Sequence, residues 1–106
     1  MHDLVIAEEI VREARKYGEI SSITVEVGDL ANILPEQLEN TLEKLTGWKI
    51  KILKKKARVR CSCSFEGNPK ITARSHDVVF FECPKCHKIP NILEGNEIII
   101  KEVNLK

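Results

Sequence analysis

Apolar residues recur at helical spacing in two segments of the first half of the chain. Between residues 3 and 17 they occupy one side of a predicted helix, with charged residues on the other side, and Gly18 ends it. A second stripe begins near Pro35, where we expect Asn32 to act as the N-cap, and stops at Gly47. The stripes comprise Leu4, Ala7, Val11 and Ala14 in the first segment and Leu34, Leu38, Leu42 and Leu45 in the second. Both segments are therefore predicted to be amphipathic helices.

Three other segments have the character of strands. Residues 20–27 alternate between apolar and polar, and Gly28 and Asp29 close this stretch. Residues 49–55 place Ile50 and Ile52 on one side, and residues 97–103 contain a run of isoleucines with strong β preference. The pattern predicts an α+β fold in which two helices pack on a small three-stranded sheet.

Residues 57–95 differ from the rest of the chain. They hold all four cysteines and three of the four prolines, show no helical periodicity, and offer only short strand candidates at residues 58–61 and 78–82. We expect them to form a zinc-ribbon-like domain inserted before the last strand. The other domain then comprises residues 1–56 with 96–106, and linkers near Ala57 and Gly95 let the two domains reorient.

The cysteines form two close pairs, Cys61-Ser62-Cys63 and Cys83-Pro84-Lys85-Cys86, separated by 19 residues. This spacing is typical of a tetrahedral zinc site, and four sulfur ligands leave no open position, so the zinc is expected to be structural. Zinc binding also stabilises a segment that lacks an apolar core. The first pair has one intervening residue instead of two, which predicts a different arrangement of backbone amides around its sulfur and a looser or strained site.

Other chemistries fit the same residues. Two disulfides need an oxidising compartment, iron accepts the same four sulfurs, and the sequence Cys83-x-x-Cys86-His87 matches a haem attachment pattern that requires export. His76 and His87 lie near the second pair in sequence. Three roles fit them: surface residues, alternative metal ligands, or hydrogen-bond partners of the ligands. Residues 1–20 contain charges throughout, and no run is long enough to span a membrane, so we expect a soluble, cytoplasmic protein with reduced thiols.

The charge of the 106-residue chain is divided unevenly along its length. The formal net charge is +1, but the residues before Trp48 sum to −6 (4 basic, 10 acidic) and those after it to +7 (13 basic, 6 acidic). Seven cations and no acidic residue occur between Lys49 and Arg60. Such a stretch fits either a nucleic-acid-binding face or a solvated strand and linker. A zinc-ribbon module that binds nucleic acid or protein is therefore an alternative function, although aromatic residues for base stacking are few.

The chain begins Met1-His2-Asp3. The terminal amine, the amide and imidazole nitrogens of His2, and the amide of Asp3 can chelate one ion in a square plane. Four nitrogens in this geometry favour Ni(II) or Cu(II) over zinc. The amides must lose their protons, so binding is expected to weaken as the pH falls.

These features together resemble the HypA family of nickel metallochaperones. The match extends over nearly the whole chain: the Met-His-acidic start followed directly by a helix, the strand and turn at residues 25–30, the helix start at residues 35–38, the cysteine pairs, and residues 95–103. The resemblance implies a carrier, not an enzyme, that delivers Ni(II) with the GTPase HypB to the large subunit of [NiFe]-hydrogenase. It maps the nickel site onto Met1, His2 and Asp3, and the zinc site onto Cys61, Cys63, Cys83 and Cys86.

Two departures from the family pattern affect details of these sites. Asp3 stands where the family usually has Glu, and Cys61 and Cys63 form a shorter pair than usual. We further expect the acidic side of the first helix, formed by Glu8, Glu9 and Glu13, to dock a partner beside the nickel site. The expected oligomeric state is a monomer or a weak homodimer.

Overall fold

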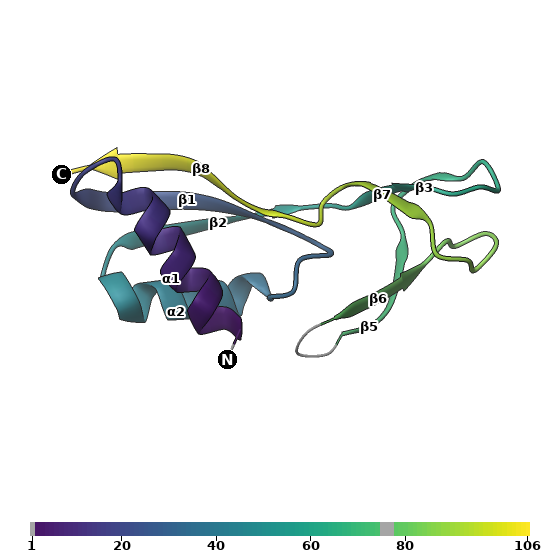
Figure 1. Cartoon of the computed structure of the whole chain (residues 1–106), viewed down its shortest axis with the longest axis horizontal. Coiled ribbons are helices and arrows are strands. Elements are labelled where there is room, and N and C mark those ends of the chain that lie inside the picture. Colours follow the sequence, from purple (N-terminus) through teal and green to yellow (C-terminus); the bar gives the residue numbers. More distant parts are fainter. Residues whose placement is uncertain (1, 75–77) are drawn as a thin grey trace.

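The computed structural model describes residues 2–74 and 78–106, and for residues 2 and 3 it describes the backbone alone. The molecule is elongated, with extents of 50 × 24 × 17 Å. Figure 1 shows two regions along the long axis. We call the elements α1, β1, α2, β2 and β8 the helix-sheet region, and residues 58–94 the cysteine region. Among the described residues, neither helix is long and apolar enough to cross a membrane.

Two helices form where the apolar stripes predicted them. Helix α1 spans His2–Arg15 and helix α2 spans Pro35–Thr46. Gly47 ends α2 in the left-handed conformation (φ 71°), and its N–H donates to the Glu43 carbonyl at 2.9 Å. The prediction that Asn32 caps α2 is wrong, because the N-cap is Leu34. A residue before proline is held in extended conformation, so Pro35 at the first helical position fixes the cap one residue ahead of itself.

The three-stranded sheet of the helix-sheet region confirms the predicted strands. It contains β1 (Ile20–Gly28), β2 (Lys49–Lys55) and β8 (Ile98–Leu105), in the order β2-β1-β8. Strands β1 and β2 are parallel because α2 makes the crossover between them, whereas β8 runs antiparallel to β1. The register between β1 and β8 shifts at Lys101, which has no partner opposite it. Both β2 and β8 are edge strands.

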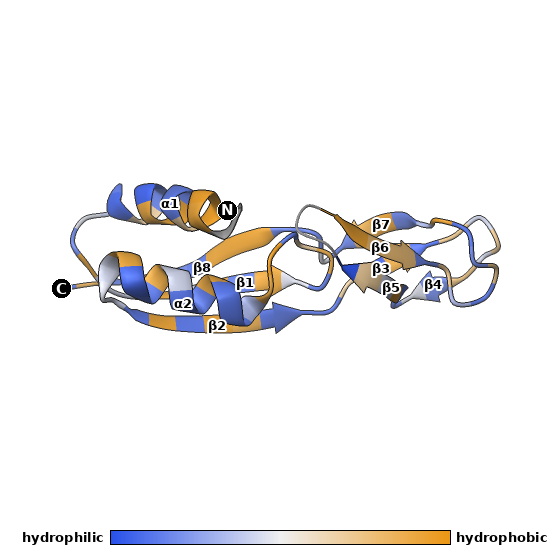
Figure 2. Cartoon of the chain, turned by 90° about the horizontal axis from the view of Figure 1, so that it is seen from below, coloured by the Kyte–Doolittle hydropathy of each residue, from blue (hydrophilic) through white to orange (hydrophobic). Residues whose placement is uncertain are grey.

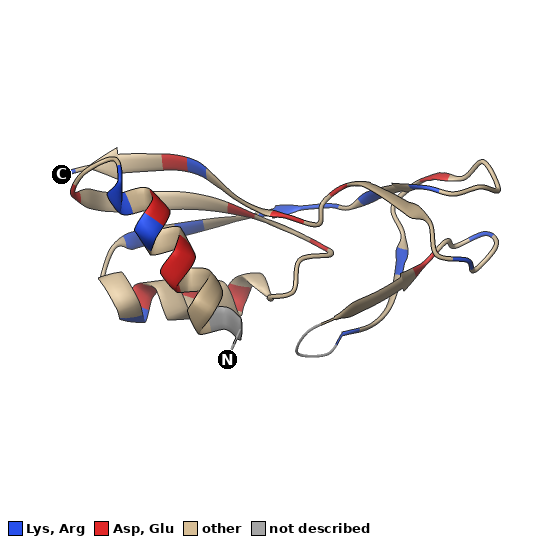
Figure 3. Cartoon of the chain, viewed as in Figure 1, with Lys and Arg blue, Asp and Glu red and all other residues tan. Residues whose placement is uncertain are grey.

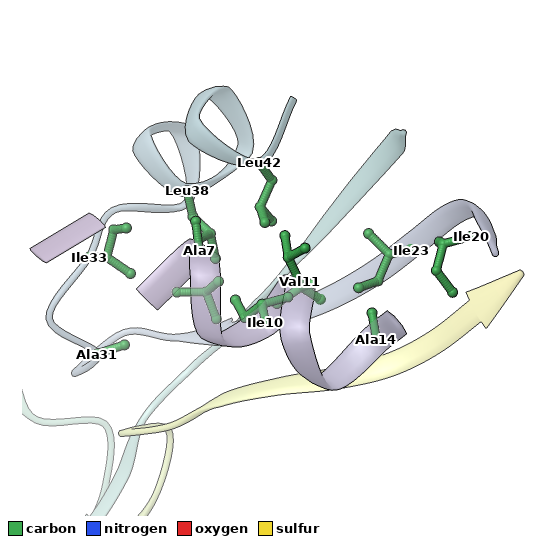
Figure 4. Close-up of a cluster of buried hydrophobic side chains, with 12 residues drawn as sticks. Ala7, Ile10, Val11, Ala14, Ile20, Ile23, Ala31, Ile33, Leu38 and Leu42 are labelled. Carbon is green, nitrogen blue, oxygen red and sulfur yellow. The ribbon is translucent and has the colours of Figure 1, made fainter. Parts of the chain in front are cut away.

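The apolar core lies between the helices and one face of this sheet (Figure 4). Ile23, Val25 and Val27 alternate along β1 and are almost completely buried, and Leu38 and Leu42 of α2 are fully buried. The apolar stripes are exposed at their ends, since Leu4, Leu34 and Leu45 are each more than 40% exposed. The opposite face of the sheet carries mainly Ser, Thr, Lys and Glu side chains, with the exposed Leu53 and Ile99 beside Glu26, and no helix covers it, so the core lies on one side.

The cysteine region consists of short strands. Strands β3 (Arg58–Arg60), β4 (Glu66–Gly67) and β7 (Asn91–Glu94) form one sheet in the order β4-β3-β7, and β5 (Lys70–Arg74) and β6 (Val79–Glu82) form a hairpin. The strands at β3 and β6 were predicted, but β4, β5 and β7 were not. Figure 2 shows apolar residues on these strands without a covering helix.

The two regions meet at a tightly packed junction at the end of β1. A Cβ atom on Gly28 would lie 2.1 Å from the carbonyl oxygen of Gly95, and one on Gly95 would lie 2.4 Å from the Cα of Ala57, so the backbones are in direct contact. The Asp29 carboxylate accepts a hydrogen bond from the amide of fully buried Ala57 at 3.2 Å. From β5, the Arg74 guanidinium donates to the carbonyls of Asp29 and Ala31. The linkers expected to act as hinges are thus hydrogen-bonded and packed.

Candidate metal centre

The first cysteine pair lies in a tight loop between β3 and β4. The Cys61 amide donates to the Phe65 carbonyl at 2.9 Å, and the Ser64 amide donates back to the Cys61 carbonyl at 3.0 Å. Ser64 has a positive φ of 77°, a left-handed conformation that is uncommon for a residue with a side chain. The loop therefore brings both thiols to the same end while it reverses the chain.

The second pair lies in a loop of the same design after β6. The Cys83 amide donates to the Lys88 carbonyl at 2.8 Å, and the His87 amide donates to the Cys83 carbonyl at 2.9 Å. His87 follows the second cysteine, as Ser64 does, and it too is left-handed, with φ 65°. Each hydrogen bond spans one residue more than in the first loop, which matches the extra residue between the cysteines. Sequence reasoning did not single out Ser64; its place directly after a cysteine pair is the signal for this conformation.

The two loops bring the four predicted cysteines together. The sulfur atoms of Cys61 and Cys86 are 3.3 Å apart and those of Cys63 and Cys83 are 3.6 Å apart, and all four lie within 4.8 Å of one another. Four sulfurs at about 2.3 Å from one zinc ion are about 3.8 Å apart in a tetrahedron. The observed separations lie around this value. Cys61 and Cys83 are buried, Cys86 is half-buried and Cys63 is exposed, and all four are free thiols. The set fits a closed four-sulfur metal site.

Backbone amides point at the sulfur atoms in both loops. The amide of Cys63 and then the thiol of Cys86 hydrogen-bond to the Cys61 sulfur and lower its pKa to about 6. Burial raises the pKa of Cys83, but the amides of Cys86 and Lys85 lower it by more. The shorter first pair thus directs one amide at its leading sulfur, whereas the second pair directs two, so the amide arrangement of the first pair differs as expected from that of a pair with two intervening residues.

The fourth thiol shows the opposite behaviour. The Lys88 amide lowers the pKa of Cys86, but its hydrogen bond to the Cys61 sulfur and its burial raise that pKa by more, to about 12. Four thiols this close cannot all ionise unless a cation offsets their charge. A divalent metal provides that charge, because bound thiols are deprotonated outright.

The predicted nickel ligands fall largely outside the described residues. Met1 is not described, and neither are the side chains of His2 and Asp3, although the backbone of both belongs to α1. His76 lies outside the described residues as well. His87 is an exposed surface residue whose Nδ1 atom contacts the Glu82 carboxylate. Among the described residues, the metal-ligating cluster consists of the four cysteines without His87.

The basic stretch at residues 49–60 is interleaved with carboxylates in space. Both Arg58 and Arg60 contact Glu66, at 2.6 and 2.9 Å, while Lys54 pairs with Glu36 and Lys55 with Glu94. Figure 3 shows acidic segments (red) close to the basic ones (blue) where the two regions join. The alternation of Ile50 and Ile52 with lysines reflects a half-buried strand, as the solvated-strand interpretation predicted. No feature of this stretch favours the nucleic-acid alternative.

The sequence is similar to that of a known family over almost its whole length. The family model described as "Hydrogenase/urease nickel incorporation, metallochaperone, hypA" matches residues 1–105. The hydrogenase maturation factor HypA of Methanocella arvoryzae is 30% identical, in an alignment covering all of this chain and 99% of the relative. The protein of the same name from Methanothermobacter thermautotrophicus is 28% identical, covering all of this chain and 98% of the relative.

The fold agrees with these matches. The solution structure of the Ni metallochaperone HypA from Helicobacter pylori superposes with a TM-score of 0.63 and 16% identity, and covers 97% of this chain and 96% of that one. At this identity the likeness shows the fold alone. The family model matches residues 1–105, and the fold and the four converging cysteines agree with that match. This chain therefore belongs to the HypA family, a family of nickel metallochaperones and not of enzymes.

Proposed function

We propose that this chain carries Ni(II) at its N-terminus and holds a structural Zn(II) ion between its two cysteine loops. The observation that carries the proposal is the convergence of four thiols, within 4.8 Å of one another, in a member of a nickel-incorporation family. The cargo ion would pass to the large subunit of [NiFe]-hydrogenase with the help of the GTPase HypB. The two metals then have separate places and separate purposes.

The zinc ligands in this proposal are Cys61, Cys63, Cys83 and Cys86. Thiolate sulfur is a preferred ligand of zinc, and four of them complete its tetrahedron, so no position remains for a substrate. The ion would tie the loop after β3 to the loop after β6, since each loop supplies two sulfurs. Because thiols bind metal where disulfides do not form, we place the protein in the cytoplasm.

The nickel ligands in this proposal are the Met1 amine, the amide and imidazole of His2, and the amide of Asp3. Helix α1 begins at His2, and the first N–H groups of a helix have no acceptor within it. Metal binding at these amides therefore breaks no helical hydrogen bond. Amides in a helix point along the axis, whereas chelation requires neighbouring nitrogens to converge on one ion. We accordingly expect nickel to unwind the first turn of α1.

The division into domains is part of the same proposal. Residues 1–56 with 96–106 would form the nickel domain and residues 57–95 the zinc domain. The acidic residues on the exposed side of α1, Glu8, Glu9 and Glu13, follow the nickel site in the same helix and provide a docking surface for a partner (Figure 3). A weakly held ion at a chain end is easily passed on, which suits a carrier.

Metal titration of the protein with an unmodified N-terminus tests the proposal. Zinc is measured by elemental analysis and Ni(II) by its absorption, for the wild type and for His2→Ala. We expect one zinc ion in both proteins and one nickel ion that disappears in His2→Ala. Unchanged nickel affinity in His2→Ala would contradict the nickel site, and a zinc-free wild type would contradict the zinc site.

Two controls separate chelation at the N-terminus from other binding. His87→Ala removes an exposed imidazole elsewhere in the chain, so it should keep the nickel ion. A protein with two extra residues before Met1 retains every side chain but moves the amine away from His2, so it should lose the nickel ion. Retained nickel in this extended protein would show that the amine is not a ligand.

A further inference from the structure

A groove lies between α1 and the edge strand β8. It has a volume of about 840 Å³. One wall is a stripe of α1 in which apolar and acidic residues alternate, and the floor is apolar and comes from β8. The stripe comprises Ile6, Glu9, Ile10 and Glu13, Tyr17 extends this wall just beyond the end of α1, and the floor comprises Ile98, Ile100 and Val103. The cysteines do not line this groove.

The groove runs beside an unpaired sheet edge. Strand β8 pairs with β1 on one side, and no described strand pairs with its other side. An edge of this kind offers backbone N–H and C=O groups to a further strand, which is a common way to bind an extended peptide. A strand added at this edge would lie next to the side of α1 that lines the groove. Every second side chain of that strand would point toward α1.

The charge at the groove selects the chemistry of the occupant. Its α1 wall supplies two carboxylates, those of Glu9 and Glu13, while Lys101 and Glu102 of β8 lie in register with the outer face of β1 and offset each other, so the lining has a net charge of −2 although the whole chain is +1. The Lys101 ammonium lies 4.0 Å from the Glu26 carboxylate of β1, so part of its charge is already offset. Glu13 has a partner in Lys16, in an exposed pair that is easily exchanged. The groove therefore favours a basic segment.

Pairing of this edge with a second copy of the chain is disfavoured in the registers that centre on its charged residues. In an antiparallel pairing of β8 with itself about a two-fold axis, the central residue opposes itself. A centre at Lys101 or Glu102 places like charges directly opposite each other, which destabilises the pair. The register shift at Lys101 further interrupts a regular self-paired ladder. The edge thus discourages self-association while it leaves the groove open.

From these observations we propose that the groove between α1 and β8 docks an extended segment of a partner protein whose side chains alternate between apolar and basic. The proposal rests on the docking part of the proposed function and deepens it, because it assigns recognition to Glu9 and Glu13 rather than to the whole acidic side of α1. Glu8 is exposed on α1 but lines a smaller hollow toward α2 instead. Nickel takes no part in this contact.

A peptide titration of the zinc-loaded, nickel-free full chain tests the proposal. The probe is a blocked synthetic peptide of alternating Lys and Val, compared with an alternating Glu and Val peptide, followed by amide NMR shifts. We expect saturable shifts confined to the α1 stripe and β8 for the Lys peptide only. The double variant Glu9→Lys with Glu13→Lys should weaken binding by about tenfold or more, since two reversed rim charges each change the binding free energy modestly.

The matched control is Glu8→Lys, which makes the same charge change on the same helix outside the groove. It should bind the Lys peptide within about twofold of the wild type, because exposed charges away from a contact are largely screened. Equal losses in Glu8→Lys and Glu9→Lys, or shifts spread over all acidic surfaces, would show nonspecific attraction and overturn the proposal. Absence of binding would overturn it too. The nickel titration above is independent of all these outcomes.

Discussion

The helix-sheet region and the cysteine region maintain their structures by different forces. The first has a cluster of twelve buried apolar residues from both helices, β1 and the loop before α2. In the second, the buried side chains among the described residues are Val59, Pro90 and two of the cysteines themselves. Apolar burial that stabilises one region is largely missing from the other. Zinc binding contributes on the order of 10 kcal/mol or more to small metal-bound folds, which is enough to replace it.

The apolar residues of the two regions illustrate the same difference. In the helix-sheet region, Leu38 and Val25 are completely buried. In the cysteine region, Phe80 is 53% exposed and Ile89 is 81% exposed, so similar side chains gain little from folding. The four sulfurs are the point where the segments of the cysteine region converge. This region should therefore depend on metal, whereas the helix-sheet region should not.

The largest effect is expected from Cys83→Ser, which removes a fully buried ligand. A hydroxyl is a poor zinc ligand, so the protein should lose its zinc and the cysteine region should unfold, while α1, α2 and the three-stranded sheet remain. Zinc analysis and hydrogen exchange measured strand by strand check this. Ser62→Ala, in the first loop but not a ligand, is the control and should retain zinc. Loss of protection throughout the chain would show that the two regions depend on the same interactions.

The reverse experiment is Leu38→Ala in the core of the helix-sheet region. Leu38 is fully buried among residues of both helices and the sheet, and its truncation leaves a cavity. We expect a loss of about 2–5 kcal/mol in the free energy of unfolding of this region, with the zinc content unchanged. Denaturant unfolding followed by the fluorescence of Trp48, which packs against this core, measures the loss. A variant that also releases zinc would contradict the separation of the two regions.

This difference also explains how far the sequence could predict the structure. Both helices and the three long strands follow periodicities of several turns or residue pairs, so their patterns were clear. Strands β4, β5 and β7 have two to five residues, too few to show a period, and their pairing depends on how the cysteine loops fold. The cysteines were recognised by spacing alone, and the structure brings all four together. The cap at Leu34 was missed because Pro35 outweighs the preference of Asn32 for caps.

The junction between the regions was only partly predictable. Gly95 was expected as a flexible linker residue, but it adopts φ 92° with its backbone packed against Ala57 and Gly28. The sequence identifies a glycine but does not show whether the position needs a flexible backbone or close packing of two backbone segments. The hydrogen bonds that hold the junction come from Asp29 and Arg74, which are distant from Gly95 in the chain. Local sequence patterns therefore do not predict them. The nickel site stays a prediction from the first three residues.

A smaller, stabilising effect is expected from Ser64→Gly in the first cysteine loop. Ser64 is exposed and left-handed, a conformation that costs a residue with a side chain about 1–2 kcal/mol. Glycine removes that cost but has more freedom in the unfolded chain, so we expect a net gain of about 0.5–1 kcal/mol in the stability of the zinc-loaded cysteine region. Rates of zinc transfer to a chelator measure it. Ser62→Gly, without the positive φ, should lower the stability instead.

The smallest effect is expected from Glu66→Gln on β4. Hydrogen bonds from Arg60, and then the charges of Arg60 and Arg58, hold the pKa of the Glu66 carboxyl below its ordinary value. A carboxyl whose pKa is lower in the folded state stabilises that state above its unfolded pKa, and this contribution is lost as the pH falls through the folded value. The wild type should therefore exceed Glu66→Gln slightly near neutral pH, with the difference shrinking toward acid. Denaturation of both proteins across this pH range measures it. Acid also protonates the cysteines, but equally in the wild type and the variant, so only the difference between the two stability curves reports on the ion pair. A difference that does not depend on pH would show that Glu66 acts through its shape and not its charge.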